Sequence, residues 1–153
     1  FTKIRKGRPV RFDCVQKLLE VADRGGEEFH LTQVAYSSKN TIEIPEIDNE
    51  FSYFLGMMLG DGSIIGERQT LGFSSADEEL QNRFKEMMNR FNASVRPVHG
   101  KDYDYKSSNR SVAWLLQQIG LPAGKKKDMK IPDCVLTSKE NLSAFLSGLM
   151  DTD

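Results

Sequence analysis

The sequence predicts an α+β domain in which helices alternate with two antiparallel β-hairpins. After residue 47, apolar residues recur at helical spacing in four segments. Between these segments lie two pairs of short alternating runs, each pair joined by a glycine-containing turn. The length of 153 residues and the apolar content of 39% suit one ordinary domain core.

Residues 1–47 are predicted to form a helical extension and a linker. Asp13 can cap a helix over residues 13–23, which a pair of glycines ends. Residues 27–47 follow as an irregular connector with a short extended stretch at residues 41–44. We expect the domain boundary near residue 47.

The first regular unit is a helix followed by a hairpin. The helix is expected over residues 50–59, with Asp48 or Asn49 as its cap. Strands are expected over residues 63–65 and 70–74.

The second unit repeats the order of helix and hairpin. Ser75 and Glu78 form a capping-box pattern for a helix that continues to Phe91. Strands over residues 94–98 and 102–106 then turn at a glycine.

Two more helices complete the chain. One is expected over residues 109–119 and ends at a glycine. A loop over residues 121–132 leads to the other, over residues 141–150, which Thr137 and Glu140 cap as a second capping box.

The charge of the chain is unevenly distributed, although its net value is −1. Residues 1–11 and 91–130 each carry +5, whereas residues 12–90 carry −8 and residues 131–153 carry −3. Local basic blocks can contact phosphate even in a neutral chain. Solvated charged faces would give the same pattern.

Cysteine usage and hydropathy indicate the compartment in which the protein occurs. Cys14 and Cys134 belong to no CxxC or Cys/His cluster, which argues against structural zinc and for a reducing compartment. No apolar run approaches the ~18 residues that a membrane span needs. We therefore expect a cytoplasmic protein without a membrane partner.

Two apolar helical runs, residues 53–61 and 145–153, nearly repeat each other at an offset of 92 residues. At this offset the glycines and the final aspartates coincide: Gly56 with Gly148, and Asp61 with Asp153. Small residues allow two helices to cross almost in contact, which would bring their ends together. Two adjacent carboxylates repel unless a cation lies between them, and oxygen ligands favour Mg²⁺ or a similar ion. Such ions activate water and stabilise the leaving oxygen in phosphodiester hydrolysis.

Other interpretations of these runs remain open. Each run alone could be an ordinary core helix that ends in an Asp-containing turn. Residues 151–153 could also begin a calcium loop or the Asp-x-Asp of a phosphotransferase, and both of these need residues downstream.

The two runs resemble the paired motifs of LAGLIDADG (dodecapeptide) homing endonucleases, in particular the two-motif, intein-associated kind. Residues 55–63 look like the first motif and residues 145–153 like the second. The resemblance covers residues 47–153 and implies an αββαββα half-saddle with a helical N-terminal extension. Residues 48–153 would then be the first half of the endonuclease domain plus the second motif helix.

The resemblance also implies roles for particular residues. The last acid of each motif coordinates the metal, so Asp61 and Asp153 are the expected catalytic ligands of Mg²⁺ or Mn²⁺. A lysine shortly before the second motif polarises the water or the phosphate, which indicates Lys130 first and Lys127 next. Asp151 is expected to cap its helix or to bond locally. The motif helices are expected to pack through their small residues, which are Gly56, Gly60 and Gly148.

Double-stranded DNA is the implied partner. Alternation along a hairpin sends one set of side chains to the core and the other set to a DNA groove, where Arg and Gln can read bases and Lys holds phosphate. The candidate contacts are the polar, cationic and aromatic side chains of the hairpins and of the lysine loop: Arg68, Gln69, Ser74, Arg96, His99, Lys101, Tyr103, Tyr105, Lys106, Lys125 and Lys126.

The expected function is site-specific, Mg²⁺-dependent cleavage of both DNA strands by a domain of an intein. A C-terminal half with the second sheet and flanking splicing segments are expected as further parts, and the present chain is expected to be inactive alone. The chain shows no N-terminal Cys or Ser nucleophile and no terminal His-Asn pair, so the splicing reaction is not assigned to it. Two alternatives remain: a DNA-binding regulator or maturase that has lost cleavage, and an inert intein remnant.

Overall fold

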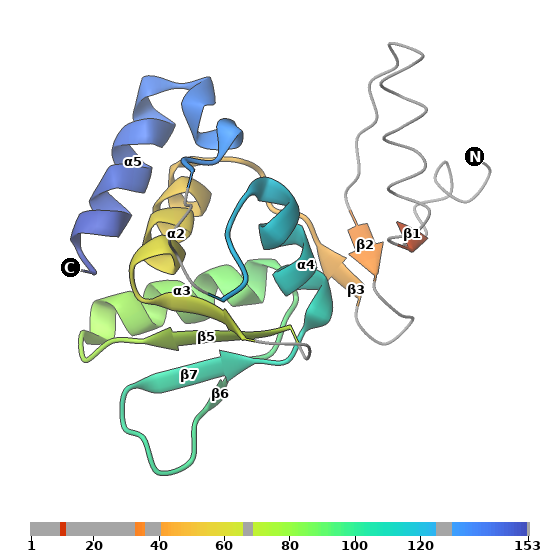
Figure 1. Cartoon of the computed structure of the whole chain (residues 1–153), viewed down its shortest axis with the longest axis vertical. Coiled ribbons are helices and arrows are strands. Elements are labelled where there is room, and N and C mark those ends of the chain that lie inside the picture. The colour runs from red at the N-terminus through yellow and green to blue at the C-terminus, as the bar shows by residue number, and fades with distance from the viewer. Residues whose placement is uncertain (1–9, 12–32, 36–40, 66–68, 125–129, 153) are drawn as a thin grey trace.

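The structure, a computed structural model, describes residues 10–11, 33–35, 41–65, 69–124 and 130–152 (Figure 1). The helix expected over residues 13–23 lies outside the described residues. No described helix is both long enough and apolar enough to cross a membrane.

A small sheet precedes the main domain. It contains β1 (Val10–Arg11), β2 (Gln33–Ala35) and β3 (Thr41–Glu43), with β1 parallel and β3 antiparallel to β2. In β3, Ile42 is fully buried in the main core, and the N–H of Glu43 donates to the carbonyl of Phe91. The chain thus joins the core before residue 47, and the domain boundary placed there stays a prediction.

Helix α2 (Asn49–Gly60) lies at the centre of the domain. The side chain of Asp48 caps it by accepting from the Phe51 N–H at 2.8 Å. Residues 54–59 are all buried, because the helix is covered on several sides.

The main sheet is antiparallel and has the strand order β4-β5-β7-β6. Its strands are β4 (Gly62–Ile65), β5 (Thr70–Ser74), β6 (Arg96–Pro97) and β7 (Asp104–Ser107). Both predicted hairpins are confirmed, and the pairing of β5 with β7 joins them into one sheet. Strand β6 is shorter than predicted and lies at the edge, where a proline is tolerated because its missing N–H disrupts no ladder.

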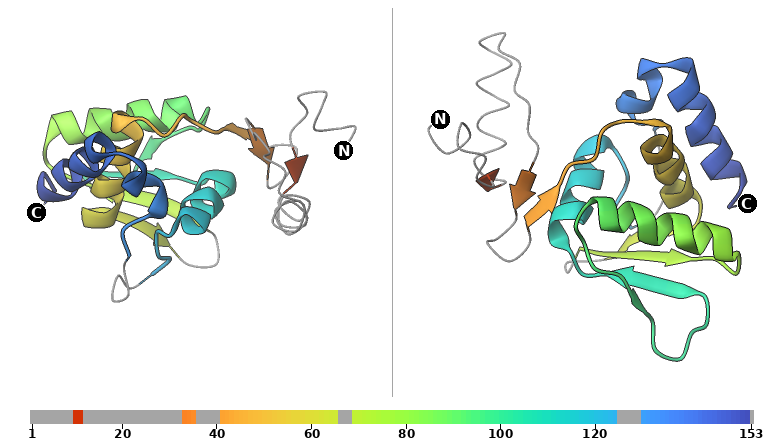
Figure 2. Two further views of the ribbon diagram at one scale, coloured as in Figure 1. Left: turned by 90° about the horizontal axis from the view of Figure 1, so that it is seen from above. Right: turned by 180° about the vertical axis from the view of Figure 1, so that it is seen from behind.

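Helix α3 (Glu78–Arg90) packs along one face of this sheet (Figure 2). The ring of Phe84 stacks on Phe73 of β5, with 5.0 Å between ring centroids. The predicted capping box is wrong, because Asp77 caps the helix by accepting from the N–H groups of Glu79 and Leu80.

The remaining helices are α4 (Arg110–Ile119) and α5 (Lys139–Met150), with a short 3-10 helix, η2 (Asp133–Thr137), between them. Helix α4 ends at Gly120 as predicted, in the left-handed conformation with φ of 116°. The cap of α5 is Ser138 and not Thr137, whose hydroxyl donates instead to the carbonyl of Cys134.

Helix α5 lies alongside α2 in both views of the domain (Figure 2). The order α2-β4-β5-α3-β6-β7-α4, followed by α5, confirms the predicted α+β fold class and its αββαββα order.

Candidate functional site: the paired helix ends and the open sheet face

Helices α2 and α5 approach each other at two glycines. A Cβ at Gly56 would overlap the carbonyl oxygen of Phe145, and a Cβ at Gly148 would overlap the carbonyl oxygen of Tyr53. The two contacts are reciprocal, since an offset of 92 residues relates Gly56 to Gly148 and Tyr53 to Phe145. A pseudo-twofold axis therefore passes between the two helices.

The same relation continues to the helix ends. A Cβ at Gly60 would overlap the hydroxyl of Thr152, which is the residue that the offset assigns to Gly60. The Thr152 hydroxyl donates to the carbonyls of Gly148 and Leu149, at 3.3 and 2.9 Å. The last turns of both helices therefore lie against each other.

The electrostatics of these ends favour a cation. Asp61 is exposed at the C-cap of α2, and Asp151 is exposed at the C-cap of α5. Neither last turn carries a basic residue; of the other two α-helices of the main domain, α3 has Arg90 in that place and α4 has none. Helix C-termini carry partial negative charge that bound cations or basic side chains usually balance, so two such ends with added carboxylates attract a positive ion.

The second predicted ligand, Asp153, lies outside the described residues, as does Lys127. Lys130 is exposed, two residues before the buried Pro132 that precedes η2. Within the described ranges, no three or more His, Cys, Asp or Glu side chains form a group that could hold a metal ion. Mg²⁺ is commonly held by one or two carboxylates together with water and substrate phosphates, so a pair of aspartates is a donor set that fits it.

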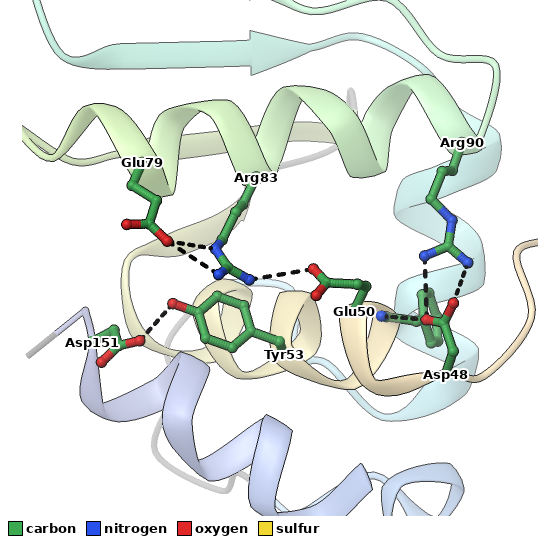
Figure 3. A network of polar contacts seen from close by, with 8 residues as sticks. Asp48, Glu50, Tyr53, Glu79, Arg83, Arg90 and Asp151 are labelled. Atoms are coloured by element: carbon green, nitrogen blue, oxygen red, sulfur yellow. Dashed lines mark hydrogen bonds and ion pairs between the residues drawn. The ribbon is translucent and has the colours of Figure 1, made fainter. Parts of the chain in front are cut away.

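Asp151 forms a contact that the sequence did not indicate. The predicted cap is confirmed, because Asp151 is the C-cap of α5 and its N–H donates to the carbonyl of Ser147. Its side chain makes a distant bond instead of a local one: the Oδ2 accepts from the hydroxyl of Tyr53 in α2 at 2.6 Å (Figure 3). Burial and the neighbouring Asp151 carboxylate raise the pKa of the Tyr53 hydroxyl. This bond fastens the end of α5 to the first motif helix.

Arg83 connects helix α3 to the pair formed by Tyr53 and Asp151. Its guanidinium lies 4.4 Å from the centre of the Tyr53 ring. It also pairs with Glu79 at 3.1 Å and with Glu50 at 3.3 Å (Figure 3). The Tyr53 ring is thus held between α3 and the end of α5.

A third ion pair joins the start of α2 to the end of α3. Arg90 donates to both carboxylate oxygens of Asp48, at 3.2 and 2.8 Å. Burial opposes ionisation of Asp48, but the bonds from Arg90 and from the Phe51 N–H outweigh it and lower the pKa of this carboxyl.

The face of the main sheet that points away from α3 carries mostly polar side chains, with Ile65 of β4 exposed among them. The register places Ser74 opposite Asp104, Gly72 opposite Lys106, and Lys106 opposite Arg96. Three candidate DNA contacts, Ser74, Arg96 and Lys106, therefore share this face, which we call the open face.

Tyr105 lies on the other face, against α3, so it does not share the open face with Ser74, Arg96 and Lys106. Its hydroxyl donates to Gln81 of α3 at 2.9 Å, and its ring lies beneath the ammonium of Lys85. Successive residues of a strand point to opposite faces, and Tyr105 adjoins Lys106.

The other candidate DNA contacts are scattered. His99, Lys101 and Tyr103 are exposed in the connection between β6 and β7, and Gln69 is in a left-handed turn with φ of 48°. Lys101 pairs with Asp104 at 2.8 Å, and its bond, with that of Ser74, lowers the pKa of the Asp104 carboxyl. Arg68, Lys125 and Lys126 lie outside the described residues.

Sequence reasoning did not single out Tyr53, Arg83 or Asp104 as polar partners. The spacing of Glu79 and Arg83 at i and i+4 on one helix was the available signal for Arg83. The residues of the bond between Tyr53 and Asp151 are 98 positions apart, so no local sequence pattern indicates it.

The fold and the paired helix ends agree with the comparisons to known proteins. The family model of the LAGLIDADG-like domain matches residues 48–147. This chain therefore belongs to the LAGLIDADG family, whose domains bind DNA, pair as dimers or two-domain proteins, and are generally nucleases that use divalent metals.

The chain is also similar to the replication factor C small subunit of Methanocaldococcus jannaschii. The two are 27% identical over 112 residues, which make up 71% of this chain. The match covers only 6% of the length of that relative.

Proposed function

We propose that this chain is a domain of a site-specific homing endonuclease that cleaves double-stranded DNA with Mg²⁺ held by Asp61 and Asp153. The observation that carries the proposal is the reciprocal approach of α2 and α5 at Gly56 and Gly148. That approach brings Asp61, at the end of α2, to the end of the helix that Asp153 follows.

In this proposal the chain's own residues position the reaction. A divalent metal held by these residues would supply charge stabilisation and lower the pKa of water. The carboxylates of Asp61 and Asp153 hold it, and Lys130 or Lys127 contributes positive charge near the scissile phosphate. The open face of the sheet lies against the duplex, with its cationic side chains on phosphate and Gln69 within reach of base edges.

A second α/β half is part of the proposal, and the surface of α5 supports it. Leu146 and Met150 are 42% and 73% exposed. The offset of 92 residues relates them to Phe54 and Met58 of α2, which are only 2% exposed because α3 and the sheet cover them. An equivalent cover over α5 would bury the apolar stripe that is otherwise in water.

An intein origin and a cytoplasmic location are also proposed. The match to a small part of a much longer relative supports a domain set within a larger protein. Residues 1–47 would then connect the endonuclease to the splicing segments.

Plasmid nicking in Mg²⁺ tests the proposal with the longer protein that contains this domain. Asp61→Asn should lower the cleavage rate by at least ~100-fold, because a lost metal ligand removes several kcal/mol of charge stabilisation. Asp133→Asn makes the same change of charge at an exposed site before α5 and should leave the rate unchanged. Equal nicking by the wild type and Asp61→Asn would refute the proposal, and binding without nicking would indicate the regulator that has lost cleavage.

A further inference from the structure

A polar cleft of about 350 Å³ lies at the edge of the main sheet, beside β6. Strand β6 supplies Arg96 and strand β7 supplies Lys106. The rest of its described lining consists of side chains with hydroxyl or amide groups: Thr41, Asn92, Ser94, Ser108 and Asn109. No carboxylate is among the described residues that line this cleft.

The two cations face each other without compensation. Arg96 and Lys106 are directly opposite partners in the pairing of β6 with β7, and both are exposed on the open face. Like charges directly opposite each other in an antiparallel pair are destabilising. Neither forms an ion pair with any residue in the described part of the chain.

Lys101 of the same hairpin provides a comparison. Its ammonium is 2.8 Å from Asp104, so its charge is compensated within the protein. Charged side chains on edge strands also block pairing between sheets. A single charged residue on β6 is enough to block such pairing. A second positive charge opposite it, beside a cleft without carboxylates, adds repulsion between the two side chains, and a bound anion would relieve that repulsion.

We propose that the cleft between Arg96 and Lys106 binds one phosphate group of the DNA backbone, shared by the two side chains. The inference rests on the proposed function and assigns these two residues to holding the backbone and not to reading bases. The hydroxyl and amide groups of the cleft complete the contact, since phosphate oxygens accept from Ser, Thr and Asn side chains as well as from Arg and Lys. The site lies beside the edge strand β6, so it contacts a part of the duplex that is distant from the paired helix ends.

The salt dependence of DNA affinity tests this assignment. Each phosphate contact contributes about −0.9 to the slope of log K against log salt. For Arg96→Gln, Lys106→Gln or both, the ratio of the affinities at 50 and 200 mM salt should shrink by about 3.5-fold. The double variant should lose no more than a single one, because one phosphate is shared. The loss should be the same on target and non-target duplexes.

Lys139→Gln is the matched control, because Lys139 is an exposed lysine at the start of α5, and it should leave the slope unchanged. An unchanged slope in the Arg96 and Lys106 variants would overturn the inference. A loss confined to the target sequence would also overturn it, since the residues would then read bases. A double variant that loses twice the slope would show two separate phosphates and overturn the shared site.

Inorganic phosphate distinguishes the source of the ligand. Titration should shift the amide resonances of Ser94, Ser108 and Asn109 in the wild type but not in the double variant. Phosphate-dependent shifts without any change of DNA affinity in the variants would identify a site for free anions and overturn the assignment to DNA. If the wild type fails to bind DNA at all, the proposed function fails; if it binds and the variants match it, only this inference fails.

Discussion

Replacing Gly56 by alanine should destabilise the domain, although alanine is the better helix former. The new Cβ would overlap the backbone oxygen of Phe145, which cannot rotate away, so α5 must move by more than 1 Å to restore ordinary contact. A gap of 0.5–1 Å already removes a quarter to a half of a dispersion contact. Phe145 is fully buried at this interface, and a side chain of that size makes roughly 50 contacts of about 0.15 kcal/mol each.

The expected net loss follows from these magnitudes. Loss of about 3 kcal/mol of packing exceeds the ~1 kcal/mol that alanine gains in helix propensity. The free energy of unfolding should therefore fall by about 2 kcal/mol, and with an m value of about 2 kcal/mol/M the urea midpoint should fall by about 1 M. Gly148→Ala should give a similar loss, because its Cβ would meet the backbone oxygen of Tyr53.

Gly60→Ala is the milder comparison, since its Cβ would overlap the Thr152 hydroxyl, which can rotate, and would lie 2.8 Å from the Thr152 Cβ, which needs only a small shift. Its urea midpoint should fall less than that of Gly56→Ala. A Gly56→Ala variant at least as stable as the wild type would refute the close approach of the two helices and the pseudo-twofold axis derived from it.

Three further outcomes are expected. Because the pKa of Asp48 is lowered, its pairing with Arg90 stabilises the domain at pH values above the unfolded pKa of 3.8, and this stabilisation is lost as the pH falls through the folded pKa. The free energy of unfolding of Arg90→Gln, measured between pH 2 and 7, should therefore be lower than that of the wild type near neutrality and equal to it in acid. A difference that does not depend on pH would contradict the pairing. Tyr53→Phe removes the bond to Asp151 and should lower the free energy of unfolding by about 1 kcal/mol. Adding Asp151→Ala should cause no further loss. Additive losses in this double-mutant cycle would show that the two side chains do not interact. Leu146→Gln with Met150→Gln should reduce self-association of the 153-residue chain in sedimentation, because these exposed side chains form its unpartnered apolar stripe. Glu140→Gln is the control, because Glu140 is exposed on the same helix but lies outside this stripe, and it should leave self-association unchanged.

Much of the fold could be predicted because its signals are local. The apolar stripe of α3, the left-handed Gly120 and the alternation in β5 each depend on neighbours within a few residues. The capping residues were harder to predict, because several polar residues lie together at each helix start. Asp77 and Ser138 cap the helices in place of the expected Ser75 and Thr137. The 3-10 helix η2 is too short to give a period.

The site was less predictable because its contacts join distant segments. The repeat of 92 residues indicated which helices meet, but the bond from Tyr53 to Asp151 depends on their rotation about each other. The direction of Tyr105 depends on strand register, and a shift of one residue exchanges the two faces of a strand. The edge cleft brings together residues 41 to 109, which no sequence window contains.

The pairing of α2 with α5 also has a consequence for how the chain folds. The residues that touch are about 90 positions apart, so this contact closes the longest loop in the domain, whereas β4, β5, α3 and β7 form from nearer segments. Helix α5 should therefore dock last. Until it does, the glycine face of α2 is open to the second motif helix of any neighbouring chain, and exchange of α5 between chains becomes the characteristic misfolding route at high concentration.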